Sequence, residues 1–501
     1  MLFHILYFAE KNWGGKLKMA DLIIKNGIIV TMDSDRRIIS NGAIVVEKDR
    51  IIDVGTTEQI KEKHKAEKII DASNHVILPG FISAHVHVAD IFLRGISANR
   101  RLYDWLDNIK YPGTHVMSVE EHILASALYC QEAIQSGITT FVENAAGSGK
   151  GEDDETIKSK LEVYDIAGMR NIYAQAIMDQ ETSQELKEIR EIDRAKEPHV
   201  NHVSLKNEAE DTNEALDRVE FLIKKYHGTA DKRQSIWPSP YLAWASTPEA
   251  MRRSYELAEK YDVMTTTHVS EMRIEEQGYH SSIEKLYSYG YLGKRTLLAH
   301  CVHLNEKDIR LLAITDTKVA HNIMANLSSG YGISPVPTMI NYGVTVGIGT
   351  DNTSLSDTVN MINDMRFVAL VHKGYHEDPG IMTAEKVLEM ATIDGARAIG
   401  REDDLGSLEP GKKADIVLLN LNHPHLTPHT NIASCIVYQA QGFEVNTVIC
   451  NGKIIMENRE VKGIESKYPD LLEEANKAAE NIIEKAGLTE IRNRPWTSIT
   501  G

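Results

Sequence analysis

Four side chains that can bind a metal ion lie where predicted β-strands end. His85 and His87 lie in the apolar run GFISAHVHV, His268 closes VMTTTHVSE, and Asp351 closes VTVGIGTDN. Residues two positions apart on a strand point to the same side, so both imidazoles of the first motif face one ligand. Three imidazoles and a carboxylate hold a divalent cation with a position open for water, which is the arrangement of a catalytic site.

A His-x-His pair alone does not establish a metal site, because such pairs also occur on surfaces and in satisfied cores. His268 and Asp351 change this balance, since they add a nitrogen and an oxygen ligand at later strand ends. We therefore predict one divalent metal per chain. The histidines favour zinc, and iron is also compatible with these ligands.

The composition is consistent with a soluble enzyme that acts on a small substrate. The 501 residues include 55 Lys and Arg against 72 Asp and Glu, a formal net charge of -17. So acidic a chain is not expected to bind nucleic acid or an anionic membrane, and no run is apolar enough to span a bilayer. The cysteines are too far apart for a disulfide framework or a thiolate zinc site, which indicates the cytoplasm. They are Cys130, Cys301, Cys435 and Cys450.

Both ends of the chain differ from its centre. LFHILYF is too short for a signal peptide, and we interpret residues 1–18 as a non-native extension before Met19. Short β segments fill residues 19–78 and 409–465, and we expect them to form one small β-sandwich built from both termini. Residues 466–501 are predicted to form a helix, whose apolar stripe packs on its own barrel, and a tail.

The central residues 79–408 alternate predicted strands and helices. This pattern indicates an α/β fold, a (β/α)8 TIM-like barrel, whose catalytic residues lie at the carboxyl ends of the strands. The charged stretch from Glu181 to Arg233 is expected to be a solvated helical insertion. The expected strand ends are near His87, Glu143, Ile177, Tyr241, Ser270, Val302, Ile323 and Asp351.

The order His-x-His, His-x-x-Glu, a later His and a final Asp resembles the amidohydrolase superfamily. PGFISAHVH, the strand with His268 and Glu271, LLAHCVHL and GTDN carry this resemblance. RGISANRRLYDWL and MINDMRFVALVHK are similar to its branch of methylthioadenosine/S-adenosylhomocysteine deaminases and triazine (atrazine-type) hydrolases. The resemblance runs from residue 20 to about residue 460 and implies a metal-dependent hydrolase barrel.

The resemblance and the ligand set together imply hydrolytic deamination. A metal held by His85, His87, His268 and Asp351 lowers the pKa of a bound water. We expect Asp351 to accept a proton from this water, Glu271 to protonate a ring nitrogen and His300 to hydrogen-bond the added oxygen. The alternative for Glu271 is a carboxylate at a helix start.

Aromatic and polar residues of the barrel loops are candidates for substrate contacts. Aromatic rings stack on flat heterocycles but also serve packing, and the arginines after the first strand also fit surface positions. His303 also fits a contact with the next helix, and His321 fits a support for the site or the core. The candidates are Arg100, Arg101, Trp105, Gln175, Tyr241, Trp244 and His303.

Three polar contacts of the nucleoside deaminases have no counterpart in this sequence. The resemblance implies a glutamate for ribose at Thr114, an arginine at Gln175 and a histidine at Pro238 or Ser239. An unpaired buried sugar hydroxyl costs about 1–3 kcal/mol, so we favour a free aminotriazine, aminopyrimidine or pterin-like ring. A methylthioadenosine, S-adenosylhomocysteine or adenosine-type nucleoside is the alternative, and loss of halide or alkylamine stays open.

The strand-4 segment SIWPSPY has no lysine to bridge two metals, which favours a mononuclear site over a dinuclear cyclic-amide hydrolase. A non-catalytic amidohydrolase-like scaffold is the alternative from another class, since a fold does not fix function. The resemblance also implies a homodimer or a higher homo-oligomer.

Overall fold

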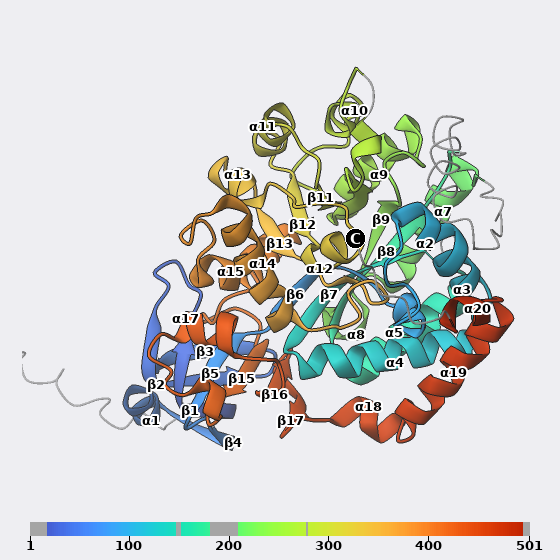
Figure 1. The fold of residues 1–501 in the computed structure, drawn as a ribbon. Helices are drawn as coiled ribbons and strands as arrows, with labels where there is room; N and C mark the ends of the chain where they lie inside the picture. The colour runs from blue at the N-terminus through green and yellow to red at the C-terminus, as the bar shows by residue number, and fades with distance from the viewer. Residues whose placement is uncertain (1–17, 147–151, 181–208, 277–278, 494–501) are drawn as a thin grey trace, which may run out of the picture.

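The computed structural model describes residues 18–146, 152–180, 209–276 and 279–493. At its centre two parallel sheets are surrounded by helices (Figure 1). One sheet has the order β14-β6-β7-β8-β9 and the other the order β10-β11-β12-β13. The strands are β6 Phe81–His87, β7 Ile138–Ala145, β8 Arg170–Ile177, β9 Gln234–Pro240, β10 Thr265–Val269, β11 Thr296–His300, β12 Lys318–His321, β13 Val346–Ile348 and β14 Asp351–Asn352.

The two sheets adjoin at both edges. Just after β9, Leu242 forms a parallel bridge with His268 of β10, and β13 runs directly into β14 of the other sheet. With β13 and β14 as one position, eight parallel strand positions alternate with helices, a TIM-barrel-type arrangement. Each strand ends within two residues of its predicted end, so that prediction is confirmed.

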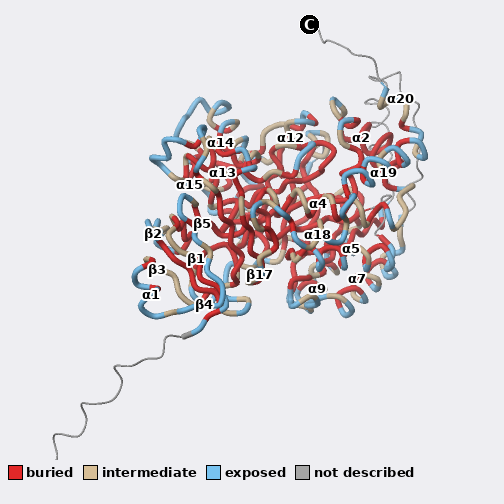
Figure 2. Tube along the Cα trace, turned by 90° about the horizontal axis from the view of Figure 1, so that it is seen from below, coloured by how far each residue is buried: buried red, intermediate tan, exposed pale blue. Residues whose placement is uncertain are grey.

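The barrel strands are buried on both faces. Every residue of β6, β7 and β8 is buried, because helices cover the outside of a parallel sheet. The buried segments accordingly gather in the interior in Figure 2. Ser118 starts one covering helix with a capping box that includes Glu121. The covering helices include α4 Val119–Gln135, α5 Asp154–Ala167, α9 Pro248–Tyr261, α10 Ser282–Ser288, α11 Glu306–Ile314, α12 Ile323–Ser328, α13 Val336–Asn341, α14 Met361–His376, α15 Ala384–Met390 and α16 Ile393–Ala398.

Strands from both ends of the chain join in a third, nine-stranded sheet. Its path is β18-β17-β16-β15-β5-β1-β2-β3, and β4 pairs with β1. The antiparallel pairing of β5 with β15 links the two ends, as the blue and orange strands of Figure 1 show. Its two-layered form stays a prediction. The elements are β1 Lys18–Val30, β2 Ile38–Glu47, β3 Arg50–Thr56, α1 Thr57–Lys63, β4 His64–Asp71, β5 His75–Pro79, β15 Ile416–Asn420, β16 Val445–Cys450, β17 Lys453–Glu457 and β18 Glu460–Val461.

Two helices on the outside of the barrel, α7 and α19, lie in segments for which the sequence makes a prediction. The predicted solvated helical insertion is confirmed in part: α7 Thr212–Tyr226 is a helix, but it is amphipathic and buries Leu216, Val219 and Ile223 against the barrel, so one of its faces is not solvated. Residues 1–17, which belong to the predicted non-native extension, and residues 181–208, the first part of the predicted insertion, lie outside the described residues. The C-terminal helix α19 Leu471–Lys485 packs on α4 of its own barrel, as predicted.

A rim segment follows β6 and covers the carboxyl end of the barrel. It consists of the 3₁₀-helix η1 Ala89–Leu93, α2 Leu102–Trp105, the π-helical turn η2 Leu106–Lys110 and α3 Tyr111–His115. Nearly all of it is buried. Among the described residues, no helix is long and apolar enough to cross a membrane.

Candidate metal centre and active site

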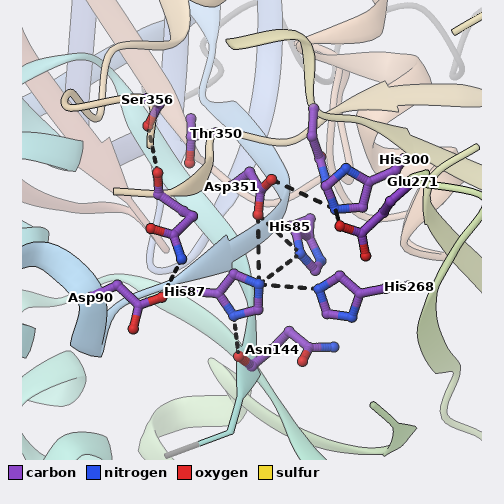
Figure 3. A network of polar contacts seen from close by, with 12 residues as sticks. His85, His87, Asp90, Asn144, His268, Glu271, His300, Thr350, Asp351 and Ser356 are labelled. Atoms are coloured by element: carbon purple, nitrogen blue, oxygen red, sulfur yellow. Dashed lines mark hydrogen bonds and ion pairs between the residues drawn. The ribbon is translucent and has the colours of Figure 1, made fainter. Parts of the chain in front are cut away.

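The four predicted metal ligands converge at the carboxyl ends of the barrel strands (Figure 3). His85 and His87 project from the same side of β6, His268 comes from β10 and Asp351 begins β14. All four side chains are buried. Residues 266 positions apart in the chain thus meet because parallel strands bring their carboxyl ends to one edge.

Their nitrogen and oxygen atoms lie within a few ångströms of one another. His87 Nε2 lies 3.3 Å from His85 Nε2 and 3.1 Å from His268 Nε2. The Asp351 Oδ1 atom lies 3.3 Å from His85 Nε2 and 3.6 Å from His87 Nε2. Two overlapping groups have the spacing of a metal site, His85 with His87 and Asp351, and His85 with His268 and His300.

Backbone carbonyls determine which imidazole nitrogens carry protons. His87 Nδ1 lies 2.8 Å from the Asn144 carbonyl oxygen, and His268 Nδ1 lies 2.6 Å from that of Tyr241. A carbonyl only accepts, so each Nδ1 is the donor and each neutral ring leaves a lone pair on Nε2. Two lone pairs then face each other at 3.1 Å without a proton between them. A cation would turn this repulsion into ligation.

Burial sets the charges at the centre. It lowers the pKa of His87 and of His268 well below the usual range, which keeps both rings neutral and able to bind a metal. Burial opposes ionisation of Asp351, but the facing imidazoles of His300 and His85 outweigh it and hold its pKa at about 2. The centre therefore combines neutral nitrogen donors with one carboxylate anion.

Glu271 and His300 lie beside this ligand group. His300 Nε2 is 3.8 Å from Glu271 Oε2 and 3.7 Å from Asp351 Oδ2. Burial and the Asp351 carboxylate raise the pKa of Glu271 to about 8, against the effect of Lys110. A carboxyl group with this pKa holds a proton at neutral pH and can donate it.

Two asparagines orient His300. Asn326 Oδ1 lies 2.8 Å from His300 Nδ1, and Asn322 Nδ2 lies 3.3 Å from His300 Nε2. His300 Nε2 is therefore an acceptor, already contacted by an amide.

Several residues around the centre have left-handed backbone conformations. The φ angles of Ser270, His300 and Asp351 are 54°, 74° and 56°. Residues other than glycine rarely adopt such angles, and they persist where the surrounding structure holds them. Strain of this kind clusters at functional sites.

A small apolar cavity adjoins the ligands. Of the predicted substrate contacts, Trp105 and Tyr241 line it. The space is about 20 Å³, roughly the room for one water molecule, and the rim segment after β6 forms part of its wall through Leu102, Trp105 and Leu106. Its other lining residues are His87, Leu242, His268, Glu271, His300, Tyr331, Asp351, Asn352 and Leu355.

The other predicted substrate contacts do not line this cavity. Gln175 is buried and lies 3.5 Å from the Glu152 carbonyl, and Trp244 packs edge-on against Tyr103. His303 lines a separate surface groove of about 810 Å³. Arg100 pairs with Asp104 at 2.9 Å, and Arg101 is exposed before α2.

His321 is buried at the end of β12, with its Nε2 3.5 Å from that of His372. Its side-chain contact is with His372, which favours the core alternative.

Several residues of the site have only weak signals in the sequence. Asn322 and Asn326 are four positions apart after a strand, a spacing that places both on one side of a helical turn. Tyr331 lies in a loop whose conformation no local pattern predicts, and Asn352 of β14 belongs to the motif GTDN, which by itself gives it no role. Asp90 and Lys110 form a buried ion pair beside the ligands. The sequence indicates a special role for Asp90 only through its place inside the otherwise apolar run VADIFL.

Comparisons with known proteins agree on one family. Residues 76–455 match the sequence profile of the amidohydrolase family. A 5-methylthioadenosine/S-adenosylhomocysteine deaminase of Syntrophomonas wolfei subsp. wolfei is 32% identical over 470 residues, 93% of this chain and 100% of that protein. An S-triazine hydrolase of Gordonia rubripertincta is 33% identical over 504 residues, 96% of this chain and 100% of that protein.

The fold has close counterparts among solved structures. An adenosine deaminase from Xanthomonas campestris with bound zinc superposes with a TM-score of 0.82 at 23% identity, covering 94% of this chain and 100% of that one. The atrazine chlorohydrolase TrzN from Arthrobacter aurescens, complexed with zinc, gives a TM-score of 0.79 at 22% identity, covering 92% of this chain and 100% of that one. These likenesses support the TIM-barrel-type fold.

Proposed function

The chain belongs to the amidohydrolase family, and from that premise we propose that it is a metal-dependent aminohydrolase acting on a small nitrogen heterocycle. Its relatives are named as hydrolytic deaminases and a triazine hydrolase. The observation that carries the proposal is the pair of Nε2 lone pairs of His87 and His268, which face each other at 3.1 Å beside an ionised carboxylate.

In this proposal His85, His87, His268 and Asp351 hold one divalent cation, and zinc fits their nitrogen and oxygen donors. The donor set suits such an ion, because both Nε2 atoms lack a proton and Asp351 stays ionised. When bound, the cation supplies Lewis acidity and a water of lowered pKa.

The protein side chains move the protons. Asp351 takes a proton from the attacking water through Oδ2, the oxygen that faces His300 at 3.7 Å. Glu271, protonated at neutral pH, donates to the ring nitrogen next to the attacked carbon and makes that carbon more electrophilic. His300 Nε2 accepts a hydrogen bond from the water in place of the one from Asn322 Nδ2, which is 3.3 Å away, and orients the water. The bond from carbon to the amine breaks as Asp351 passes its proton to that leaving group, and the remaining proton of the added hydroxyl returns to the Glu271 carboxylate as the carbonyl forms.

A free ring is favoured over a nucleoside, because the residues at the expected sugar-binding positions are engaged elsewhere. The Thr114 hydroxyl donates to the Lys110 carbonyl at 2.9 Å, and the Ser239 hydroxyl donates to the Thr266 carbonyl at 3.1 Å. Gln175 does not line the cavity. Apart from the histidine centre, Glu271 and Asn352, the lining is apolar or aromatic, a character that suits a flat, compact ring once the cavity, which has room for about one water molecule, opens to admit it.

Nucleoside deamination is the second candidate. It is supported by the deaminase relatives, among them a 5'-deoxyadenosine deaminase of Methanosarcina barkeri at 30% identity over 470 residues. The S-triazine hydrolase relative supports the free ring to the same degree. Loss of halide or alkylamine in place of ammonia would use the same side chains.

Ammonia release separates the candidates. Zinc-loaded protein is assayed against aminotriazines, aminopyrimidines, guanine, pterins, adenosine, methylthioadenosine and S-adenosylhomocysteine, with Glu271→Gln as the control. We expect turnover of free rings and a strong loss in the control. Turnover confined to nucleosides would replace the free ring by the second candidate, and turnover of nothing, with no release of halide or alkylamine from substituted triazines, would favour a non-catalytic scaffold.

Further parts of the proposal concern the molecule as a whole. We propose one zinc per chain, a homodimer or higher homo-oligomer, and a cytoplasmic location. We also propose that the eight strand positions close into one barrel, and that the terminal sheet folds into a sandwich of residues 19–78 and 409–465. Elemental analysis, light scattering and a crystal structure test these statements.

A further inference from the structure

A buried ion pair joins two parts of the rim segment that follows β6. Lys110 of η2 contacts Asp90 of η1 through Nζ and Oδ2, and each side chain is 1% exposed. Apolar residues in place of such a pair often leave stability unchanged or raise it. The other oxygen of Asp90, Oδ1, has no hydrogen-bond partner among the described residues, which is unfavourable for a buried acceptor. A contribution to the stability of the fold therefore does not explain why this ion pair is present.

The Asp90 carboxylate also holds Asn352. Asn352 Nδ2 donates to Asp90 Oδ2 across 262 positions of sequence. At its other end, Asn352 Oδ1 accepts from the backbone nitrogen and the hydroxyl of Ser354, at 2.9 and 2.7 Å. The asparagine side chain is thus fixed at both ends.

Asn352 directly follows the carboxylate of the metal centre. Asp351 has the left-handed φ of 56°, a conformation that needs support from its surroundings. Asp351 and Asn352 together form β14, which pairs with Val86 and His87 of β6. Whatever fixes Asn352 therefore fixes the direction in which the Asp351 carboxylate leaves the backbone.

Lys110 also contacts Trp105, a residue that lines the cavity. Its Nζ lies 5.3 Å from the centroid of the Trp105 ring, within the range of a cation–π contact. Trp105 lines the cavity together with Asn352. One buried ion pair thus contacts Trp105 in the wall of the cavity and Asn352 in the strand that carries Asp351. Figure 3 shows Asp90 on the His87 side of this centre.

We propose that Asp90 and Lys110 are positioning residues that act through Asn352: they hold the Asp351 carboxylate where metal binding and proton transfer require it. The proposal rests on the proposed function, because that function gives Asp351 its role. Neither Asp90 nor Lys110 lines the cavity, so neither is assigned a contact with substrate.

The test compares two double variants in the full-length protein. Asp90→Leu/Lys110→Met removes both charges, so no charge stays buried alone. Arg170→Met/Asp415→Leu is the matched control. It removes a pair with 1% and 5% exposed side chains, in which Arg170 begins β8 at the end of the barrel opposite the metal centre. The thermal midpoint, the zinc affinity in competition with a chelator, and kcat and KM for a panel substrate are measured for each.

We expect the Asp90→Leu/Lys110→Met protein to fold, to bind zinc about 10-fold more weakly or worse, and to lose about 10- to 100-fold in kcat, the range typical of residues that support metal ligands. KM should change less than kcat. The control should keep the zinc affinity and kcat of the wild type. Equal zinc affinity and kcat in the wild type and the Asp90→Leu/Lys110→Met protein would overturn the proposal.

A second variant covers the case in which the double variant does not fold. Asn352→Ala keeps the ion pair and removes the amide that links it to Asp351, so the same loss of zinc affinity is expected. Unchanged zinc affinity would overturn the proposal here too. A wild-type protein that binds no zinc at all would instead refute the proposed function, and the positioning role with it.

Discussion

Two buried polar clusters differ in how their polar atoms are satisfied: a charge cluster between α5 and the strands β7 and β8, and the histidine centre at the carboxyl ends of the strands. In the charge cluster, Lys160 donates to Glu143 at 2.5 Å and to the two oxygens of Glu152 at 2.8 and 2.9 Å. Tyr164 and Tyr173 donate to the same two carboxylates, at 2.7 and 2.6 Å. Each carboxylate oxygen of this cluster therefore has a donor.

The histidine centre has the opposite character. The acceptor nitrogens of His87 and His268 face each other at 3.1 Å, and the Asp351 oxygen 3.6 Å from His87 Nε2 is a further acceptor. A cluster whose atoms satisfy one another stabilises the fold and needs no ligand. A cluster of acceptors needs a cation. This difference, more than burial or charge, separates the candidate active site from its scaffold.

Removing a metal ligand should have the largest effect. His268→Ala takes one nitrogen from the centre and leaves the charge cluster intact, so we expect loss of bound zinc and a fall in kcat/KM of about 10⁴-fold or more. Elemental analysis and ammonia release measure the two effects. The exposed His280→Ala is the control, and retention of zinc and activity in His268→Ala would contradict the ligand assignment.

Glu271→Gln should lower kcat by about 10³-fold, within the range for a general acid. The amide has nearly the same shape but cannot supply the proton, so zinc content should stay at the wild-type level. Steady-state kinetics with the metal content determined in parallel tests this. A variant with full activity would exclude Glu271 as the proton donor.

Lys160→Met should affect stability and spare the chemistry. It leaves two buried carboxylates without their cation, which typically lowers the free energy of unfolding by about 3 kcal/mol or more. Zinc affinity and kcat of the folded protein should change little. Urea denaturation measures the loss, with the exposed Lys158→Met on the same helix as the control. A stable but inactive variant would remove the distinction between the two clusters.

The pH dependence should show the smallest effect, about tenfold per pH unit on one limb. Burial and the Asp351 carboxylate raise the pKa of Glu271 to about 8, so the acid form is present below that pH and lost above it. The rate should therefore fall as pH rises through this pKa, and a bound cation shifts the limb to lower pH. Glu271→Gln should lose this limb. A limb that persists in the variant would belong to another group.

The sequence predicted the ligands because their signal is local. The alternation in HVH and a strand-end histidine or aspartate need no knowledge of distant contacts. The rule that parallel strands present their carboxyl ends at one edge then brings His268 and Asp351 to His85 and His87. The strand ends could be predicted for the same reason.

The cavity wall could not be predicted in this way. Trp105 and Tyr241 line the cavity, but Trp244, from the same predicted group, packs against Tyr103. Which loop side chain reaches the site depends on how the rim segment folds back over the barrel. The link from Asp90 to Asn352 spans 262 positions, and no periodicity reports such a contact. The sequence predicts a solvated segment at Thr212–Tyr226 because its many charged residues obscure the pattern of a narrow apolar stripe.

The central claim is that the facing acceptors of the histidine centre hold a metal ion, and the metal content of the purified, folded protein tests it most directly. Elemental analysis should find about one zinc per chain in the wild type and little in His268→Ala. A folded wild-type protein that retains no divalent metal after exposure to zinc would contradict the account.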